Sequence, residues 1–79
     1  MRVIGEIVHP DCKITLFHWN NRYLIKLESG LLEQTYKIPE YDLPGEAALQ
    51  QVVSETFIQA ALQRFDAMQR SLNQSLESI

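Results

Sequence analysis

Apolar and polar residues alternate with a period of two through the first half of the chain, a pattern typical of β-strands. Four such segments cover residues 2–9, 12–19, 22–28 and 31–38. They are separated by the pairs Pro10-Asp11, Asn20-Asn21 and Ser29-Gly30, residue types that favour two-residue hairpin turns. The pattern therefore predicts a meander of four antiparallel strands.

Counting outward from each turn predicts which residues face each other across neighbouring strands. Across Asn20-Asn21, the predicted pairs are His18 with Tyr23, Leu16 with Ile25, Ile14 with Leu27, Trp19 with Arg22, Phe17 with Leu24, Thr15 with Lys26 and Lys13 with Glu28. Across Ser29-Gly30, they are Leu27 with Leu32, Tyr23 with Tyr36, and Lys26 with Glu33. These registers preserve the same two faces along the whole sheet.

One predicted face is mainly apolar, and we call it the inner face. It carries Val3, Ile7, Ile14, Leu16, Tyr23, Ile25, Leu27, Leu32, Tyr36 and Ile38. Gly5 lies on the same face opposite Leu16, and a glycine inside a strand marks either a bulge or the close approach of another backbone. We expect a helix to cover the inner face and to use the space at Gly5.

The opposite, outer face combines charged residues with Ile4, Val8, Phe17, Trp19 and Leu24. An uncovered face of an antiparallel sheet is usually polar, so this apolar content indicates an interaction site. This face carries five cations and three anions. The cations are Arg2, Lys13, Arg22, Lys26 and Lys37, and the anions are Glu6, Glu28 and Glu33. Arg22 is placed for a cation–π contact with Trp19. The alternative is that Trp19 only shields the end of its hairpin.

The hydrophobic period changes after a linker at residues 40–45. Apolar residues then recur every three or four positions, which predicts one continuous helix over residues 44–77. Its stripe consists of Leu49, Val53, Phe57, Ala61, Phe65, Met68, Leu72, Leu76 and Ile79. The chain is therefore predicted to be a single α+β domain, residues 1–79: a four-stranded antiparallel meander followed by one long C-terminal helix packed on one sheet face.

The predicted helix is longer than the sheet that it covers. The periodic segment over residues 47–78, about 32 residues, spans ~48 Å as a helix, whereas a strand of seven or eight residues spans ~25 Å. The stripe stays apolar beyond Phe65, through Met68, Leu72 and Leu76, which favours burial against a partner. The alternative is a frayed tail from about Ser71.

Composition narrows the classes of function. The 79 residues carry a net charge of −3, which disfavours nucleic acid or an anionic membrane as partner. Cys12 is the only cysteine, which excludes an intrachain disulfide and favours a reducing cytoplasm. The first residues show no signal-peptide pattern, and no segment approaches the ~20 apolar residues of a membrane span, so we expect no membrane association.

Candidate chemistry centres on His9, Asp11, Cys12 and His18, which are ligand types for zinc. Their spacing disfavours a metal site, because His18 lies some 20 Å along the strand from Cys12. Cys12 also lacks a helix N-terminus or a fixed cation that would activate its thiol. The chain contains no glycine-rich phosphate loop. We therefore predict no catalytic residues, no metal and no cofactor; a small enzyme or ligand-binding domain ranks third among the possible functions.

Two apolar surfaces are left without a partner, namely the outer face and the helix beyond Phe65. They favour a non-catalytic homodimeric interaction module. Its predicted interface consists of Phe17, Trp19, Leu24, Met68, Leu72 and Leu76. Trp19 is expected to be buried in that dimer.

The order of four strands and one helix, with the segment Asn21-Arg22-Tyr23-Leu24-Ile25-Lys26, resembles one repeat of the Pur-alpha family of single-stranded nucleic-acid binding proteins. The segment is similar to the second strand of that repeat. The resemblance implies a curved sheet that contacts nucleic acid, in domains made by two intertwined repeats. It implies that Phe17 and Trp19 stack on bases and that Arg22 and Lys26 meet phosphate. Single-stranded DNA or RNA binding is therefore the alternative function.

Overall fold

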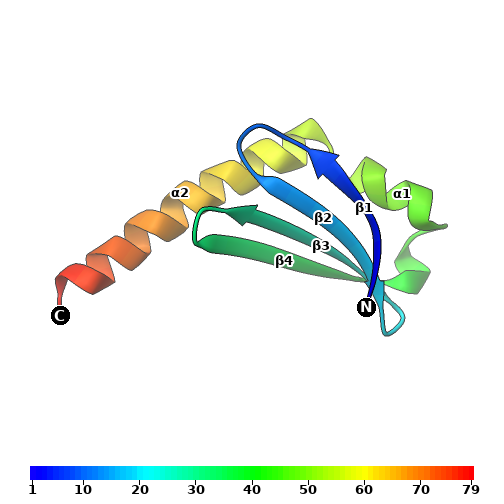
Figure 1. Ribbon diagram of the computed structural model, residues 1–79, viewed down its shortest axis with the longest axis horizontal. Helices are drawn as coiled ribbons and strands as arrows, with labels where there is room; N and C mark the ends of the chain where they lie inside the picture. Colours follow the sequence, from blue (N-terminus) through cyan, green and yellow to red (C-terminus); the bar gives the residue numbers. More distant parts are fainter.

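The alternating segments form one antiparallel sheet in the computed structural model, which describes residues 1–79. Its strands are β1 (Arg2–Val8), β2 (Lys13–Trp19), β3 (Arg22–Ser29) and β4 (Leu32–Pro39), in the order β1-β2-β3-β4. The 3-10 helix η1 (Glu40–Asp42) and the helices α1 (Glu46–Val52) and α2 (Glu55–Glu77) follow (Figure 1). The predicted α+β meander with a long C-terminal helix is confirmed.

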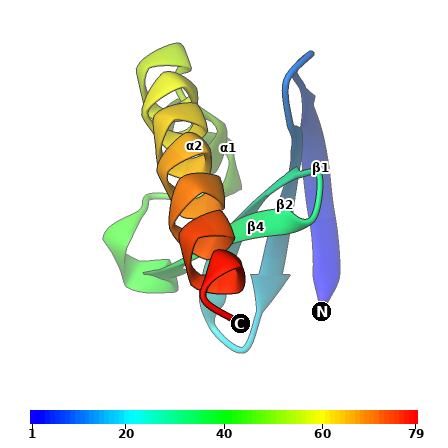
Figure 2. The ribbon, with the colours of Figure 1, turned by 90° about the vertical axis from the view of Figure 1, so that its left-hand side faces the viewer.

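Both α-helices lie on one side of the sheet and leave its other side uncovered (Figure 2). The covered side is the predicted inner face. Its buried core consists of Cys12, Ile14, Leu16, Tyr23, Ile25 and Leu27 from the sheet side and Leu49, Val53, Ile58, Ala61 and Phe65 from the helices. Ile58 was absent from the predicted helical stripe, whereas the predicted Phe57 is only half-buried.

The central hairpin of β2 and β3 has the predicted register throughout, from Lys13 opposite Glu28 to Trp19 opposite Arg22. Its turn residues Asn20 and Asn21 have φ angles of 54° and 62°. Positive φ at both central positions is the requirement of a type I′ turn, whose twist matches that of the flanking strands. Asparagine tolerates this left-handed conformation better than most residues, so the local sequence and the pairing agree.

The turn between β3 and β4 is not the predicted Ser29-Gly30. The structure pairs Ser29 with Leu32 and turns at Gly30 and Leu31. The predicted partners on β4 were therefore wrong by two residues, so that Leu27 faces Gln34 and Lys26 faces Thr35. Gly30, with φ +60°, takes the first turn position, where a type II′ turn favours glycine. Because the shift is even, the inner and outer faces are unchanged.

A β-bulge in β1 overturns the predicted face of three residues. Ile4, predicted on the outer face, packs against the buried core. The register shifts between Val3 and Gly5, so that Gly5 faces Leu16 but Val3 faces Phe17. Val3 consequently lies on the outer face, while Arg2 moves to the inner side and forms an ion pair with Glu46 of α1. Gly5 marks this bulge and not a close approach, since a Cβ added there would meet no atom within 4 Å.

The predicted continuous helix over residues 44–77 is broken at Val53 and Ser54. Val53 leaves the helical conformation, with φ −85° and ψ 66°, and Ser54 caps α2 by accepting a hydrogen bond from the Phe57 N–H at 3.2 Å. A serine at an N-cap satisfies a donor that the first helical turn leaves free. The hydrophobic period continues across the break, which is why the pattern alone predicted a single helix.

The expected excess of helix over sheet is present. The 23 residues of α2 span about 34 Å at ~1.5 Å each, and the helix extends past the turn between β3 and β4 (Figure 1). Residues 71–77, which we call the overhang, are all exposed. Leu72 is 45% and Leu76 56% exposed, so the overhang remains helical without burying its apolar side chains in the protomer.

Replacement by alanine is expected to have different effects at Gly30, in the turn between β3 and β4, and at Gly5, in β1. At Gly30, Gly30→Ala forces a left-handed φ on a residue with a Cβ and is expected to lower the free energy of unfolding by about 1 kcal/mol. Gly5→Ala serves as the matched control, because it has equal space and no positive φ, and is expected to be neutral or slightly stabilising. Urea unfolding measures both, and equal losses would contradict the assigned turn.

Candidate functional site

The exposed apolar residues of the outer face lie at its margins, at Val3, Val8 and Trp19, and not at its centre. Phe17 and Leu24 face each other in the centre of the sheet, but Leu24 is only 6% exposed and Phe17 is half-buried. Trp19, at the end of β2, is 45% exposed. Of the three interface residues predicted on the sheet, Trp19 alone therefore presents a large accessible area in the protomer.

The charge of the outer face is also more balanced than predicted. Arg2 has left this face through the bulge, so the cations Lys13, Arg22, Lys26 and Lys37 stand against Glu6, Glu28 and Glu33. The Lys26 Nζ lies 3.3 Å from Glu33 Oε2 and 3.9 Å from Glu28 Oε1. Lys26 is consequently ion-paired with Glu28 and Glu33, whereas Arg22 and Lys37 form no ion pair.

The expected cation–π contact between Arg22 and Trp19 is not formed. The cation–π contacts of the structure are made instead by Arg64 of α2, with Tyr36 and Phe57. Its guanidinium carbon lies 5.7 Å from the centre of the Tyr36 ring and 5.9 Å from that of Phe57. The two rings themselves meet edge to face, with centroids 5.3 Å apart. Arg64 therefore ties α2 to β4 by packing, with no carboxylate as partner.

A polar network at the same place was not anticipated from the sequence. The Gln34 amide Nε2 donates to the Ala61 carbonyl at 2.8 Å, and its Oε1 accepts from the Tyr36 hydroxyl at 2.7 Å and from Arg64 Nε at 3.1 Å. The available signal was Gln34 itself, a polar residue at an inner-face position of β4. The network satisfies this amide and holds α2 at a defined position over the edge strand.

A shallow groove continues from this network along α2. One depression of about 410 Å³ lies between β4 and α2, lined by Gln34, Thr35, Tyr36, Arg64, Ala67 and Met68. A second, of about 600 Å³, is lined by Leu32, Ala67, Met68, Ser71, Leu72 and Ser75. Two predicted interface residues, Met68 and Leu72, thus line the groove, and Leu76 extends the apolar face along the overhang.

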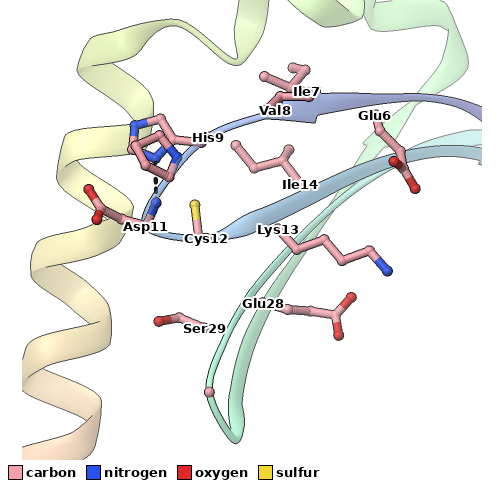
Figure 3. Close-up of a pocket in the computed structure, with 12 residues that line it drawn as sticks. Glu6, Ile7, Val8, His9, Asp11, Cys12, Lys13, Ile14, Glu28 and Ser29 are labelled. Atoms are coloured by element: carbon pink, nitrogen blue, oxygen red, sulfur yellow. Dashed lines mark hydrogen bonds between the residues drawn. The ribbon is translucent and has the colours of Figure 1, made fainter.

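The histidine and cysteine near the first turn line a separate depression of about 540 Å³ (Figure 3). His9 and Cys12 lie there with Asp11, Lys13 and Glu28. The Lys13 and Glu28 side chains extend away from the His9 imidazole (Figure 3), because they belong to the outer face. The depression therefore spans two faces of the sheet end, and its polar groups do not converge on one point.

The surroundings of Cys12 do not activate its thiol as a nucleophile. Burial, followed by the negative charges of Asp11 and Glu55, raises the pKa of the Cys12 thiol above its usual 9.0. The His9 Nδ1 accepts a hydrogen bond from the Asp11 N–H at 3.2 Å, and its Nε2 lies 3.6 Å from Glu55 Oε1. A hydrogen bond from Gln59, with a smaller contribution from His9, lowers the pKa of Glu55. His9 thus joins the first turn to the start of α2.

His18 lies apart from this cluster. Its Nε2 is 3.5 Å from Glu40 Oε2, and its ring is tilted against Tyr23 with centroids 5.2 Å apart. No three histidine, cysteine or acidic side chains gather closely enough to hold a metal ion.

Neither α-helix combines the length and apolar content needed to cross a membrane. Comparisons with family models, with curated proteins and with solved structures gave no match.

From the geometry described above, the candidate functional surfaces are the groove with its overhang and, secondarily, the exposed end of the outer face around Trp19.

The state of Cys12 predicts its reactivity. Because the thiolate is the nucleophile and burial keeps this thiol protonated at neutral pH, iodoacetamide is expected to alkylate Cys12 slowly in the folded protein. The rate should increase after unfolding in urea and, in the folded protein, above pH 9. Mass spectrometry of timed samples measures the modification. Alkylation of the folded protein at pH 7 as fast as in urea would contradict the burial and favour a reactive site.

Proposed function

We propose that the protein is a small, non-catalytic interaction module that acts as a homodimer. The observation that carries the proposal is the overhang of α2, an ordered helical segment whose Leu72 and Leu76 side chains are about half exposed. A helix that continues past its own sheet with an apolar stripe gains stability when a second surface covers that stripe.

The charges of this segment favour a second copy of the chain as the partner. Asp66 and Arg70 form an ion pair at 3.0 Å, and the residues from Ser71 to Leu76 are uncharged. The segment from Ser71 to Leu76 can therefore lie against a second copy of the chain without contributing a charge of its own. A domain of this size also has a limited core, so association adds a substantial part of its stability.

We further propose a cytoplasmic location for this module. Its support is the single cysteine, Cys12, which is buried and has no disulfide partner in the chain. Proteins of reducing compartments commonly keep such thiols free.

Replacing the overhang leucines should dissociate the dimer. The double variant Leu72→Ser with Leu76→Ser is expected to weaken self-association at least about tenfold, since each buried leucine side chain contributes roughly 1.5 to 3 kcal/mol. Gln74→Ser, on another face of the same segment, is the matched control and should leave association unchanged. Sedimentation at micromolar concentrations measures both variants. A well-folded monomer of the unmodified chain would contradict the proposal, as would a dimer that the double variant leaves intact.

A second candidate function is single-stranded nucleic-acid binding, as the resemblance to a Pur-alpha repeat implies. Its support is the uncovered outer face, where the exposed Trp19 stands opposite Arg22 and Arg22 has no acidic partner. Phe17 and Lys26, the other two residues of this hypothesis, are less available, because Phe17 is half-buried and Lys26 is paired with carboxylates.

This candidate predicts that a single-stranded oligonucleotide quenches the fluorescence of Trp19, the only tryptophan. The affinity should fall steeply with salt, because cations that bind phosphate release counterions. Trp19→Ala should cost about 1 to 3 kcal/mol of binding and leave the oligomeric state unchanged. Titration at low salt with and without Arg22→Gln measures the effect. Absence of quenching at low salt would remove this candidate.

A further inference from the structure

The outer strand β4 has backbone groups that the protomer leaves free. The Glu40 N–H donates to the Asn21 carbonyl at 3.1 Å, which extends the ladder between β3 and β4 by one pair. Hydrogen-bonded pairs alternate along an antiparallel ladder, so the bonded residues of β4 are Gln34, Tyr36 and Ile38. The N–H and C=O groups of Glu33, Thr35 and Lys37 therefore point away from β3. We call these outward-facing groups the β4 edge.

Exposed sheet edges are usually blocked, because they pair with other strands. Pro39 occupies an outward-facing position at one end, where it has no N–H to offer. Between Leu32 and Ile38 the β4 edge has no proline, no bulge and no covering segment of the sheet, since strand order ends at β4. The edge is thus available to another strand.

The side chains of β4 are complementary to themselves in one antiparallel register. When two copies of β4 are centred on Thr35, Glu33 of each faces Lys37 of the other. On the inner side, Gln34 then faces Tyr36 and Leu32 faces Ile38. Opposite charges and matched apolar residues in directly facing positions stabilise a strand pair.

Other registers lose this complementarity. Centring on Gln34 or Tyr36 leaves Glu33 and Lys37 opposite uncharged residues of the second copy. Centring on Glu33 places the two Glu33 carboxylates against each other, and centring on Lys37 does the same for the two ammonium groups. Like charges directly opposite are destabilising. Lys37 has no acidic partner within the protomer, whereas Glu33 shares the single cation Lys26 with Glu28. The second copy would supply a carboxylate to Lys37 and a second cation to Glu33.

We infer that two copies of the chain associate through the β4 edge, in the antiparallel register centred on Thr35, to form a continuous eight-stranded sheet. This inference rests on the proposed homodimer and specifies its interface. The outward-facing groups of Glu33, Thr35 and Lys37 then form roughly six backbone hydrogen bonds across the two-fold axis. Both helical layers lie on the same side of the joined sheet, as an isologous pair requires.

The same register accounts for the overhang. α2 leaves the sheet past the Leu32 end of β4, beyond the turn at Gly30 and Leu31 (Figure 1). In the antiparallel pair, the second copy continues from its Ile38 into residues 39–43 beyond that same end. The overhang with Leu72 and Leu76 therefore extends in the direction of this second-copy segment, which contains the 88% exposed Tyr41. Strand pairing and burial of the overhang then belong to one interface.

Charge exchange tests the register. E33K alone and K37E alone place like charges opposite each other twice, and each should weaken self-association roughly tenfold. The E33K chain carries two lysines on the edge and the K37E chain two glutamates, so their mixture should form a heterodimer at least as stable as the unmodified dimer. Sedimentation of each variant and of the mixture measures this, with circular dichroism as the control for folding. A mixture that associates no better than its components would overturn the register.

A cross-link distinguishes failure of this inference from failure of the dimer itself. In a Cys12→Ala background, Thr35→Cys places two thiols at the two-fold axis, with Cα atoms ~5.5 Å apart and within disulfide range. Lys37→Cys is the matched control, because its two copies would be separated by ~13 Å. Rapid oxidation of T35C alone supports the inference. A dimer in which T35C does not cross-link overturns the register and leaves the homodimer standing, whereas a monomeric unmodified chain overturns both.

Discussion

Burial of the inner sheet face under α1 and α2 is the interaction on which the rest of the structure depends. The central strands β2 and β3 supply Ile14, Leu16, Ile25 and Leu27, which are at most 1% exposed, and the helices cover them. A chain of 79 residues forms a single hydrophobic core, so its stability depends on the burial of this face. The position of every other surface, including the groove and the β4 edge, follows from how α2 crosses this face.

Polar contacts join α2 to the sheet side at two places. His9 and Glu55 join the first turn to the start of the helix, and the Gln34 network with Arg64 joins its middle to β4. Hydrophobic burial alone does not fix the orientation of α2 on the sheet, because it is non-directional. The polar contacts restrict that orientation. Beyond these contacts α2 continues past the Leu32 end of β4, where the overhang begins (Figure 1).

The centre of the outer face presents little apolar surface, whereas Val3, Val8 and Trp19 are exposed at its margins. Leu24 and Thr15 occupy central positions on this face and are each 6% exposed, and Lys26 lies directly opposite Thr15. Lys26 is itself held by Glu28 and Glu33. Apolar residues at the centre of an uncovered sheet are thus shielded within the protomer, and Trp19 at the hairpin end is not.

The sequence by itself determined the fold class, the β2–β3 register and the two faces of the sheet, because alternation and the asparagine turn are local properties. It also identified the overhang, since helix and strand lengths follow from residue counts. The choice between Ser29-Gly30 and Gly30-Leu31 was decided by pairing along the whole of β4, and the bulge by the packing of β1. The helix break at Ser54 depended on a cap that periodicity does not register. Of the candidate site, Met68, Leu72 and Leu76 were predictable, whereas Gln34 and Arg64 meet only because α2 folds back over β4, a contact between residues 30 apart in the chain.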